Sequence, residues 1–415
     1  REDVLEIYGR VSQAMQNPQN EEEEILYNLL NELEGNITGI RESIVGYNFV
    51  FAATTQQSEG AAIKRAKEIT DNDSHPTYDT IIIDEAARVN PGDLMVPMAQ
   101  GKRRIILVGD HRQLPHIYNE EIFENMQSID GAVGKDVVKI SMFEYLMQKA
   151  KELYSQDQVE RTITLDAQYR MHPLLGKFVS GQFYDKYDEG FRSPLSEDSF
   201  QQNLYSKPLI WIDLQNSAGN EEKYGTSRIR RCEADVIADK IKEFMESGKG
   251  IYYDDDGKKK ELKYGVITFY SAQVKEIQKN LGVYADRVRV GSVDAFQGME
   301  FDVIFLSVVR SHKKAPDVNY DLLNMDMADV SRDSETYSNW KKYIDKLGMS
   351  AYGFLTSENR LCVALSRQKK LLVVVGDSNI FVGETWCDVA DKCVPAMKAL
   401  YELAQREGEI INGKA

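Results

Sequence analysis

The chain is poor in cysteine, with four thiols in 415 residues. No two of them form a C-x-x-C pair: they are Cys232, Cys362, Cys387 and Cys393. This spacing argues against a zinc site and against a disulfide framework of the kind that small secreted domains use. We therefore expect reduced thiols in an intracellular protein, cytoplasmic or nuclear.

Long apolar segments are missing too. No uninterrupted apolar run reaches the roughly 18–20 residues that a membrane-spanning helix needs. The first residues also lack the basic, apolar and small-residue order of a signal peptide. No membrane partner is expected. The composition, 42% hydrophobic and 28% charged, is ordinary for globular domains, and the length predicts two or three of them.

The chain has no excess of positive charge, because 51 basic residues stand against 66 acidic ones, for a net charge of −15. This balance argues against a protein that binds polyanions over its whole surface. The acid is unevenly placed, with clusters in residues 21–24, 254–256 and 326–335. A local basic groove for nucleic acid therefore remains open.

The most informative run that the chain does contain is Thr80–Ala87, TIIIDEAA. Residues that favour strands lead into two adjacent carboxylates, as at the carboxyl end of a buried parallel strand, where α/β sheets bind their ligands. Asp84 suits coordination of Mg²⁺ on a nucleotide, and Glu85 suits polarisation of an attacking water. Taken alone, the run fits a strand capped by two solvated acids equally well.

Strands and helices are predicted to alternate. Residues 48–55 predict one strand, and residues 78–110 predict a strand, a helix and a second, parallel strand. After residue 160, strands are predicted at 208–213, 264–270, 287–293, 302–309 and 370–376, with helices at 229–246 and 271–281. The order indicates an α/β fold with doubly wound parallel sheets. Residues 1–40 predict polar helix, and residues 312–357 an irregular or helical surface insertion.

Three further runs place polar side chains where a ligand would bind. In VGDHRQLP, Gln113 follows a strand and suits sensing of a γ-phosphate. In LDAQYRMHP, Tyr169 offers a face for stacking, and Arg170 a fork for a phosphate. In GSVDAFQGMEFD, Gly298 allows a tight turn and Glu300 suits a ribose hydroxyl. Each run alone also fits an ordinary polar loop.

The run NRLCVALSRQ predicts a buried helix. Arg360 and Arg367 are seven residues apart, so they are expected on roughly the same face of it. Arg367 suits the role of an arginine finger, which stabilises a transferring phosphoryl group.

These runs, with VFAATT before them, closely resemble in their order the motifs of superfamily 1 helicases. More narrowly, they are similar to the superfamily 1B branch that contains the nonsense-mediated-decay RNA helicase and senataxin. The resemblance covers about residues 45–400, and QYRMHP and VDAFQG are its most specific parts. It implies two RecA-like domains that clamp ATP and move single-stranded RNA or DNA, with 5′-to-3′ polarity.

The resemblance also implies residue roles. Asp84 would coordinate Mg²⁺, Glu85 would act as the base for the hydrolytic water, and Gln113 would sense the γ-phosphate. Arg170 and Arg367 would stabilise the transferring group.

Other positions would hold the rest of the ligands. Tyr169 would pack on the adenine, Glu300 would contact the nucleotide sugar, and the turn at Gly298 would allow close approach of the backbone. The nucleic-acid backbone would meet Thr54, Thr55, Ser292 and Asp294. For these four, a local role in a cap or a turn is as good an explanation.

One family motif is absent from the sequence. A phosphate-binding loop needs G-x-x-x-x-G-K-[S/T], and none of the six Gly-Lys pairs is followed by Ser or Thr. We therefore expect a fragment that begins after this loop, at Arg1. Residues 1–40 would end an accessory region, 41–158 would complete the first RecA-like domain, and 159–415 would form the second.

The function expected is that of an ATP-dependent helicase core, with the fragment inactive by itself. An alternative is a helicase-like module without turnover that binds nucleic acid or protein. No motif distinguishes RNA from DNA.

Overall fold

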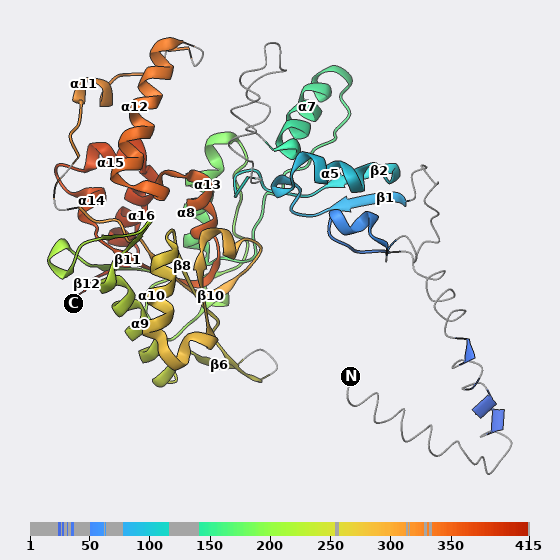
Figure 1. The fold of residues 1–415 in the computed structure, drawn as a ribbon, viewed down its shortest axis with the longest axis horizontal. Coiled ribbons are helices and arrows are strands. Elements are labelled where there is room, and N and C mark those ends of the chain that lie inside the picture. Colours follow the sequence, from blue (N-terminus) through green and yellow to red (C-terminus); the bar gives the residue numbers. More distant parts are fainter. Residues whose placement is uncertain are drawn as a thin grey trace. The chain divides into compact units, whose positions relative to one another are not determined.

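The computed structural model describes residues 50–61, 63, 78–115, 141–253, 257–312, 314, 316–327, 330–331 and 334–413, preceded by 24, 25, 27, 28, 31, 35 and 36. The chain divides into two compact units, Arg1–Gly109 and Asp110–Ala415 (Figure 1). The helix predicted over residues 1–40 lies almost wholly outside the described residues, and the predicted domain boundaries stay predictions.

In the first unit, two parallel strands lie side by side: β1 (Tyr78–Ile83) and β2 (Gly101–Leu107). The connection between them contains η2 (Ala86–Arg88) and α5 (Pro91–Met98). Pro91 suits the first turn of α5. An amide hydrogen at this position would have no acceptor within the helix, and proline has no amide hydrogen. The predicted strand–helix–strand unit is confirmed. The burial expected of its first strand is wrong, because Ile83 is the one buried residue of β1 and Ile82 is 67% exposed.

The strand predicted over residues 48–55 is wrong for its described part, residues 50–55. The backbone instead enters the short 3₁₀ helix η1 (Gln56–Glu59). Thr54 accounts for the difference. Its Oγ1 accepts from the Gln57 amide at 3.3 Å, and its carbonyl accepts from the Ser58 amide at 2.9 Å. A threonine bonded to nearby backbone in this way favours a turn over a strand.

The second unit is built on a six-stranded sheet in the order β12-β3-β11-β10-β8-β9, and every neighbouring pair is parallel. The strands are β3 (Leu209–Asp213), β8 (Tyr264–Thr268), β9 (Val288–Ser292), β10 (Phe301–Ser307), β11 (Gln368–Gly376) and β12 (Glu409–Asn412). The five strands predicted after residue 160 are confirmed, and β12 was not predicted.

Helices cover both faces of this sheet (Figure 1). Because successive strand residues point to opposite faces, Trp211 and Ile212 enter different cores. The core of Ile212 also contains side chains of α9 (Arg231–Glu246) and α10 (Ser271–Leu281). The core of Trp211 contains side chains of α8 (Pro173–Phe183), α12 (Glu335–Ala351), α13 (Glu358–Ala364), α14 (Asn379–Val382), α15 (Cys387–Cys393) and α16 (Pro395–Arg406). The predicted doubly wound α/β class is confirmed.

The remaining elements lie around this framework. They are α7 (Met142–Asp157), η3 (Asp185–Tyr187), the hairpin of β4 (Glu222–Tyr224) and β5 (Ser227–Ile229), and the hairpin of β6 (Ile251–Tyr253) and β7 (Lys259–Glu261). Across the described ranges, no helix combines the length and the apolarity needed to cross a membrane.

The segment 312–357 is largely helical, with α11 (Tyr320–Leu323), α12 and η8 (Gly353–Thr356). It is more than a surface insertion, because Ile344, Leu347 and Ala351 of α12 belong to the core on the Trp211 face.

A fully buried ion pair at the start of α9 is hydrogen-bonded to the end of β10. The Arg230 guanidinium and the Glu233 carboxylate lie 3.1 Å apart. Glu233 also accepts from the Ser307 hydroxyl at 2.7 Å and from the Val309 amide at 2.9 Å. Val309 has a φ of 67°, which is rare for a β-branched residue. The carboxylate therefore stabilises a backbone turn that steric repulsion disfavours.

Glu233→Ala is expected to lower the unfolding free energy of the second unit by about 3–5 kcal/mol, because the Arg230 charge stays buried without its partner. Denaturation followed by tryptophan fluorescence measures this unit, since it contains all three tryptophans of the chain, Trp211, Trp340 and Trp386.

Glu243→Ala on the same helix is the control. Its carboxylate is 55% exposed and pairs with Lys240 on the surface, so a change below about 0.5 kcal/mol is expected. Equal losses in the two variants would contradict a structural role for the buried pair.

Candidate active site

The predicted metal ligand, Asp84, and the predicted catalytic base, Glu85, lie where β1 ends. Asp84 directly follows the strand, and its Oδ1 accepts from the Glu85 amide at 2.9 Å. Glu85 adopts the left-handed conformation, with φ 53° and ψ 33°. The next amide, of Ala86, donates to the Val108 carbonyl beyond β2 at 2.8 Å. This sharp turn keeps both carboxylates exposed at the carboxyl ends of two parallel strands. Strained backbone of this kind often occurs at functional sites.

Thr54 and Thr55 belong to the same unit. Thr54 is exposed and accepts the backbone bonds that start η1. Thr55 is half-buried, and its carbonyl accepts from the Ser58 hydroxyl at 2.6 Å. Both residues thus make local turn contacts, and their contact with nucleic acid stays a prediction.

Gln113 is held from two sides within the second unit. Its Nε2 donates to Asp110 Oδ2 at 2.7 Å, and its Oε1 accepts from Arg367 Nη2 at 3.0 Å. Asp110 Oδ2 also accepts from the Tyr184 hydroxyl at 2.6 Å. The amide group of Gln113 is therefore fixed in orientation, with its oxygen toward a guanidinium.

Asn359 fixes the backbone of the same loop. Its Nδ2 approaches three successive carbonyl oxygens, those of His111, Arg112 and Gln113, at 3.3, 3.0 and 2.7 Å. Glu189 holds the side chains: it accepts from Arg112 Nε at 2.8 Å and lies 3.4 Å from the His111 ring nitrogen.

Arg367 is the centre of the group. It is 1% exposed, and its donors reach the Val363 carbonyl at 3.2 Å, the Ser366 hydroxyl at 2.8 Å and Gln113. In the part of the chain that the structure describes, no carboxylate lies within 4.0 Å of this guanidinium. Burial, and then the neighbouring charge of Arg170, lower the pKa of Arg367 to about 10. A buried cation held only by neutral groups is a characteristic of functional sites.

Arg170 approaches the same point. Its Nη1 donates to the Ser366 carbonyl at 3.3 Å, and its Nε lies 3.3 Å from Glu300 Oε2. Glu300 also forms an ion pair with Lys369. The hydrogen bond and the charge of Lys369, and then those of Arg170, hold the pKa of the Glu300 carboxyl below its usual range. Tyr169, next to Arg170, is 64% exposed, so its ring is open to a ligand.

The prediction that Arg360 and Arg367 share a helix face is wrong. α13 ends at Ala364, and Leu365 already has the non-helical ψ of 6°. Arg367 therefore lies beyond the helix. Arg360 is partly exposed, and its guanidinium lies 3.8 Å from the Asp294 carboxylate.

The turn predicted at Gly298 is present, with a φ of 75° that favours glycine. Ser292 ends β9, and Asp294 follows it in η7 (Val293–Phe296). Both residues line a cavity of about 100 Å³. Their contact with nucleic acid stays a prediction, as does the ligand contact at Gly298.

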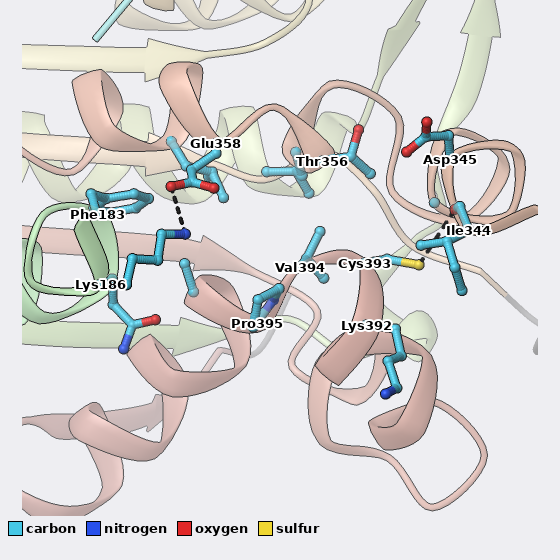
Figure 2. A pocket seen from close by; sticks show the side chains of 15 residues that line it. Phe183, Lys186, Ile344, Asp345, Thr356, Glu358, Lys392, Cys393, Val394 and Pro395 are labelled. Atoms are coloured by element: carbon cyan, nitrogen blue, oxygen red, sulfur yellow. Dashed lines mark hydrogen bonds and ion pairs between the residues drawn. The ribbon is translucent and has the colours of Figure 1, made fainter. Parts of the chain in front are cut away.

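A larger cavity of about 260 Å³ has walls from α8, α12, η8, α13 and the α15–α16 connection (Figure 2). Figure 2 shows Lys186 paired with Glu358 at 2.7 Å on one side, and Cys393 on another. None of the predicted site residues lines it, so this cavity is not the site assembled around Arg367.

The structure thus brings Gln113, Arg170, Arg367 and Glu300 into one network in the second unit, whereas Asp84 and Glu85 belong to the first. Asn359, Glu189 and Asp110 were not predicted. Asn359 begins the run NRLCVALSRQ, but nothing in this run indicates a contact with the loop of Gln113. That loop lies 246 to 248 positions earlier in the sequence.

Arg367→Met is expected to leave the unfolding free energy of the second unit within about 1 kcal/mol of wild type, or to raise it. The substitution removes a buried charge that has no ion-pair partner. Arg230→Met is the matched control, because it removes an equally buried guanidinium but leaves Glu233 unpaired, at a cost of about 3–5 kcal/mol. A loss for Arg367→Met as large as that of the control, in denaturation followed by tryptophan fluorescence, would make Arg367 a structural residue.

Comparison with known proteins agrees with this geometry. Two family models match, both described as AAA domain, over residues 138–379 and 5–120. The chain is 28% identical over 327 residues to the "Regulator of nonsense transcripts 1 homolog" of Neurospora crassa. It is 28% identical over 316 residues to "DNA polymerase alpha-associated DNA helicase A" of Schizosaccharomyces pombe, and 23% identical over 342 residues to "Helicase sen1" of the same organism.

These alignments cover 73%, 73% and 80% of this chain but 23%, 37% and 17% of the three relatives, so the chain spans only a minor part of their length. With an AAA-domain model matched over more than half of its residues and these relatives, the chain belongs to the superfamily 1 helicases, in the branch of the nonsense-mediated-decay helicase and senataxin.

Proposed function

We propose that this chain forms the greater part of an ATP-dependent translocase core, which couples ATP hydrolysis to 5′-to-3′ movement on single-stranded RNA or DNA. The observation that carries the proposal is the burial of Arg367 among neutral groups. A charge in this environment lacks a counter-charge, and a phosphate is the anion that a guanidinium fork fits best. The triphosphate of ATP supplies that charge, together with the free energy of its hydrolysis.

The residues around Arg367 suit a phosphate that gains charge during transfer. Arg170 adds a second guanidinium whose partner, Glu300, is shared with Lys369. Gln113 presents its oxygen to Arg367, so an anion bound there competes for the same donor. We assign the response to the γ-phosphate to Gln113, and transition-state stabilisation to Arg170 and Arg367. Exposed Tyr169 would stack on the base, and Glu300 and the Gly298 turn would lie near the sugar.

The carboxylates of the first unit suit the remaining roles. Mg²⁺ on a nucleotide needs only one or two protein carboxylates besides phosphate oxygens and water. Asp84 fits as one such ligand, because it is exposed and its Oδ1 is oriented by the Glu85 amide. Glu85 would accept the proton of the attacking water.

The track is proposed as a single strand because the motifs resemble those of superfamily 1 helicases. That it is a nucleic acid agrees with the names of the relatives, which describe helicases and a regulator of transcripts. Thr54, Thr55, Ser292 and Asp294 are the proposed backbone contacts. Cytoplasmic or nuclear localisation is proposed from the cysteine usage. RNA and DNA are both open, and the experiment below distinguishes them.

The 415-residue chain alone is expected to hydrolyse ATP negligibly, even with saturating nucleic acid, because no G-x-x-x-x-G-K-[S/T] loop is available to hold the β- and γ-phosphates. Release of inorganic phosphate by the purified chain measures this. Robust turnover would contradict the need for such a loop.

In a longer polypeptide that joins this chain to such a loop, ATP turnover is expected to rise with single-stranded RNA or single-stranded DNA, and Glu85→Gln is expected to lower the stimulated kcat by about 100-fold or more. Steady-state phosphate release with each polymer, or with neither, identifies the track. Asp79→Asn is the matched control, because it removes the same charge from an exposed position of β1 and should leave kcat unchanged. Nucleic-acid binding without any stimulated turnover would favour the inactive binding module instead.

A further inference from the structure

An exposed aromatic side chain lies next to the residues proposed to contact nucleic acid. Phe354, in η8, is 40% exposed. It lines the cavity of about 100 Å³ at the carboxyl ends of β8 and β9, together with Phe269, Ser292, Val293, Asp294 and Arg360. The segment 312–357 therefore contributes a side chain directly to this edge of the sheet.

The position of Phe354 depends on the backbone before it. Gly353 has a φ of 57°, and a Cβ there would lie 2.5 Å from the Tyr270 hydroxyl and 2.6 Å from Arg310 Nη1. Only glycine fits both the conformation and the space. This close approach sets the Phe354 ring 5.5 Å from the ring of Tyr270, which follows β8. The exposed ring is thus fixed by its surroundings.

Arg360 lies beside this ring and adds a charge to the exposed surface. Its guanidinium carbon lies 5.0 Å from the centroid of Phe354, in a cation–π contact. Asp294, 3.8 Å away, partly neutralises the charge. The pair therefore offers aromatic and guanidinium planes with little net charge, which favours stacking on a base over attraction to a phosphate.

We propose that Phe354 and Arg360 form a stacking platform for one unpaired base of the bound strand. The inference rests on the proposed function, since it places the base beside the backbone contacts at Ser292 and Asp294. Stacking accepts every base, as movement along a strand of any sequence requires.

Binding of the chain to fluorescein-labelled oligouridylate and oligothymidylate of about 12 nucleotides, measured by anisotropy without ATP, tests the platform. Phe354→Leu keeps the apolar volume but removes the π-face, and is expected to weaken binding at least about fivefold. The dependence of affinity on salt should stay the same, because no phosphate contact is lost. Phe354→Trp should bind at least as tightly as wild type.

Two controls separate stacking from a general structural effect. Tyr224→Leu removes an aromatic side chain that is 62% exposed on the β4–β5 hairpin and should leave affinity unchanged. An oligonucleotide of equal length whose sugars carry no bases should bind wild type and Phe354→Leu equally. If Phe354→Leu damaged the structure in general, the variant would also bind this baseless strand more weakly than wild type.

Each outcome decides the inference. Equal affinity of wild type and Phe354→Leu for the normal strand would overturn the platform and leave the translocase proposal standing. A loss that persists with the baseless strand, or that changes the salt dependence, would also overturn it. Absence of binding by the wild-type chain would overturn both proposals.

Discussion

The second unit is organised around one physical constraint: the guanidinium of Arg367 is buried without a counter-charge. Arg367 donates to Val363, Ser366 and Gln113, and none of these groups is charged. To hold a cation in this way, the chain needs a helix end that offers carbonyls, and a loop that brings Gln113 to it. Asn359 fixes that loop through three carbonyls. An acidic partner would have made the site more stable and less able to bind phosphate.

The second unit also contains a buried guanidinium that does have a counter-charge, that of Arg230. This guanidinium is just as buried, but Glu233 lies 3.1 Å away and also holds the strained turn at Val309. The charge of Arg230 is therefore balanced by a carboxylate that also fixes the backbone, whereas the charge of Arg367 has no counter-charge. Burial alone does not identify a functional cation. What distinguishes Arg367 from Arg230 is that it has no carboxylate partner. The left-handed Glu85 is a comparable case in the first unit, where strain occurs directly beside a proposed catalytic carboxylate.

Much of the fold could be predicted from local patterns, since apolar runs that end in polar residues indicate parallel strands. The central strands of the second unit are buried as this pattern predicts, whereas β1 and β2 are largely exposed. Asp84 and Glu85 follow β1, and Gln113 follows β2, for this reason. The errors arose where single side chains override the pattern. Thr54 turns a predicted strand into η1 through its own hydrogen bonds. α13 ends too early for a seven-residue spacing to mean a shared face. Contacts across the chain, such as that of Asn359, leave no local signal.

The helix α13 links the two ends of the proposed activity. Asn359 contacts the loop of Gln113, and Arg360, the next residue, contacts both Asp294 and Phe354. Neighbours on a helical turn cannot move independently without breaking its backbone hydrogen bonds. A phosphate that competes with Gln113 for Arg367 acts on the loop that Asn359 holds. Any shift of α13 that follows must also displace Arg360. In the proposed function, this short helix is a covalent route from the nucleotide to the strand.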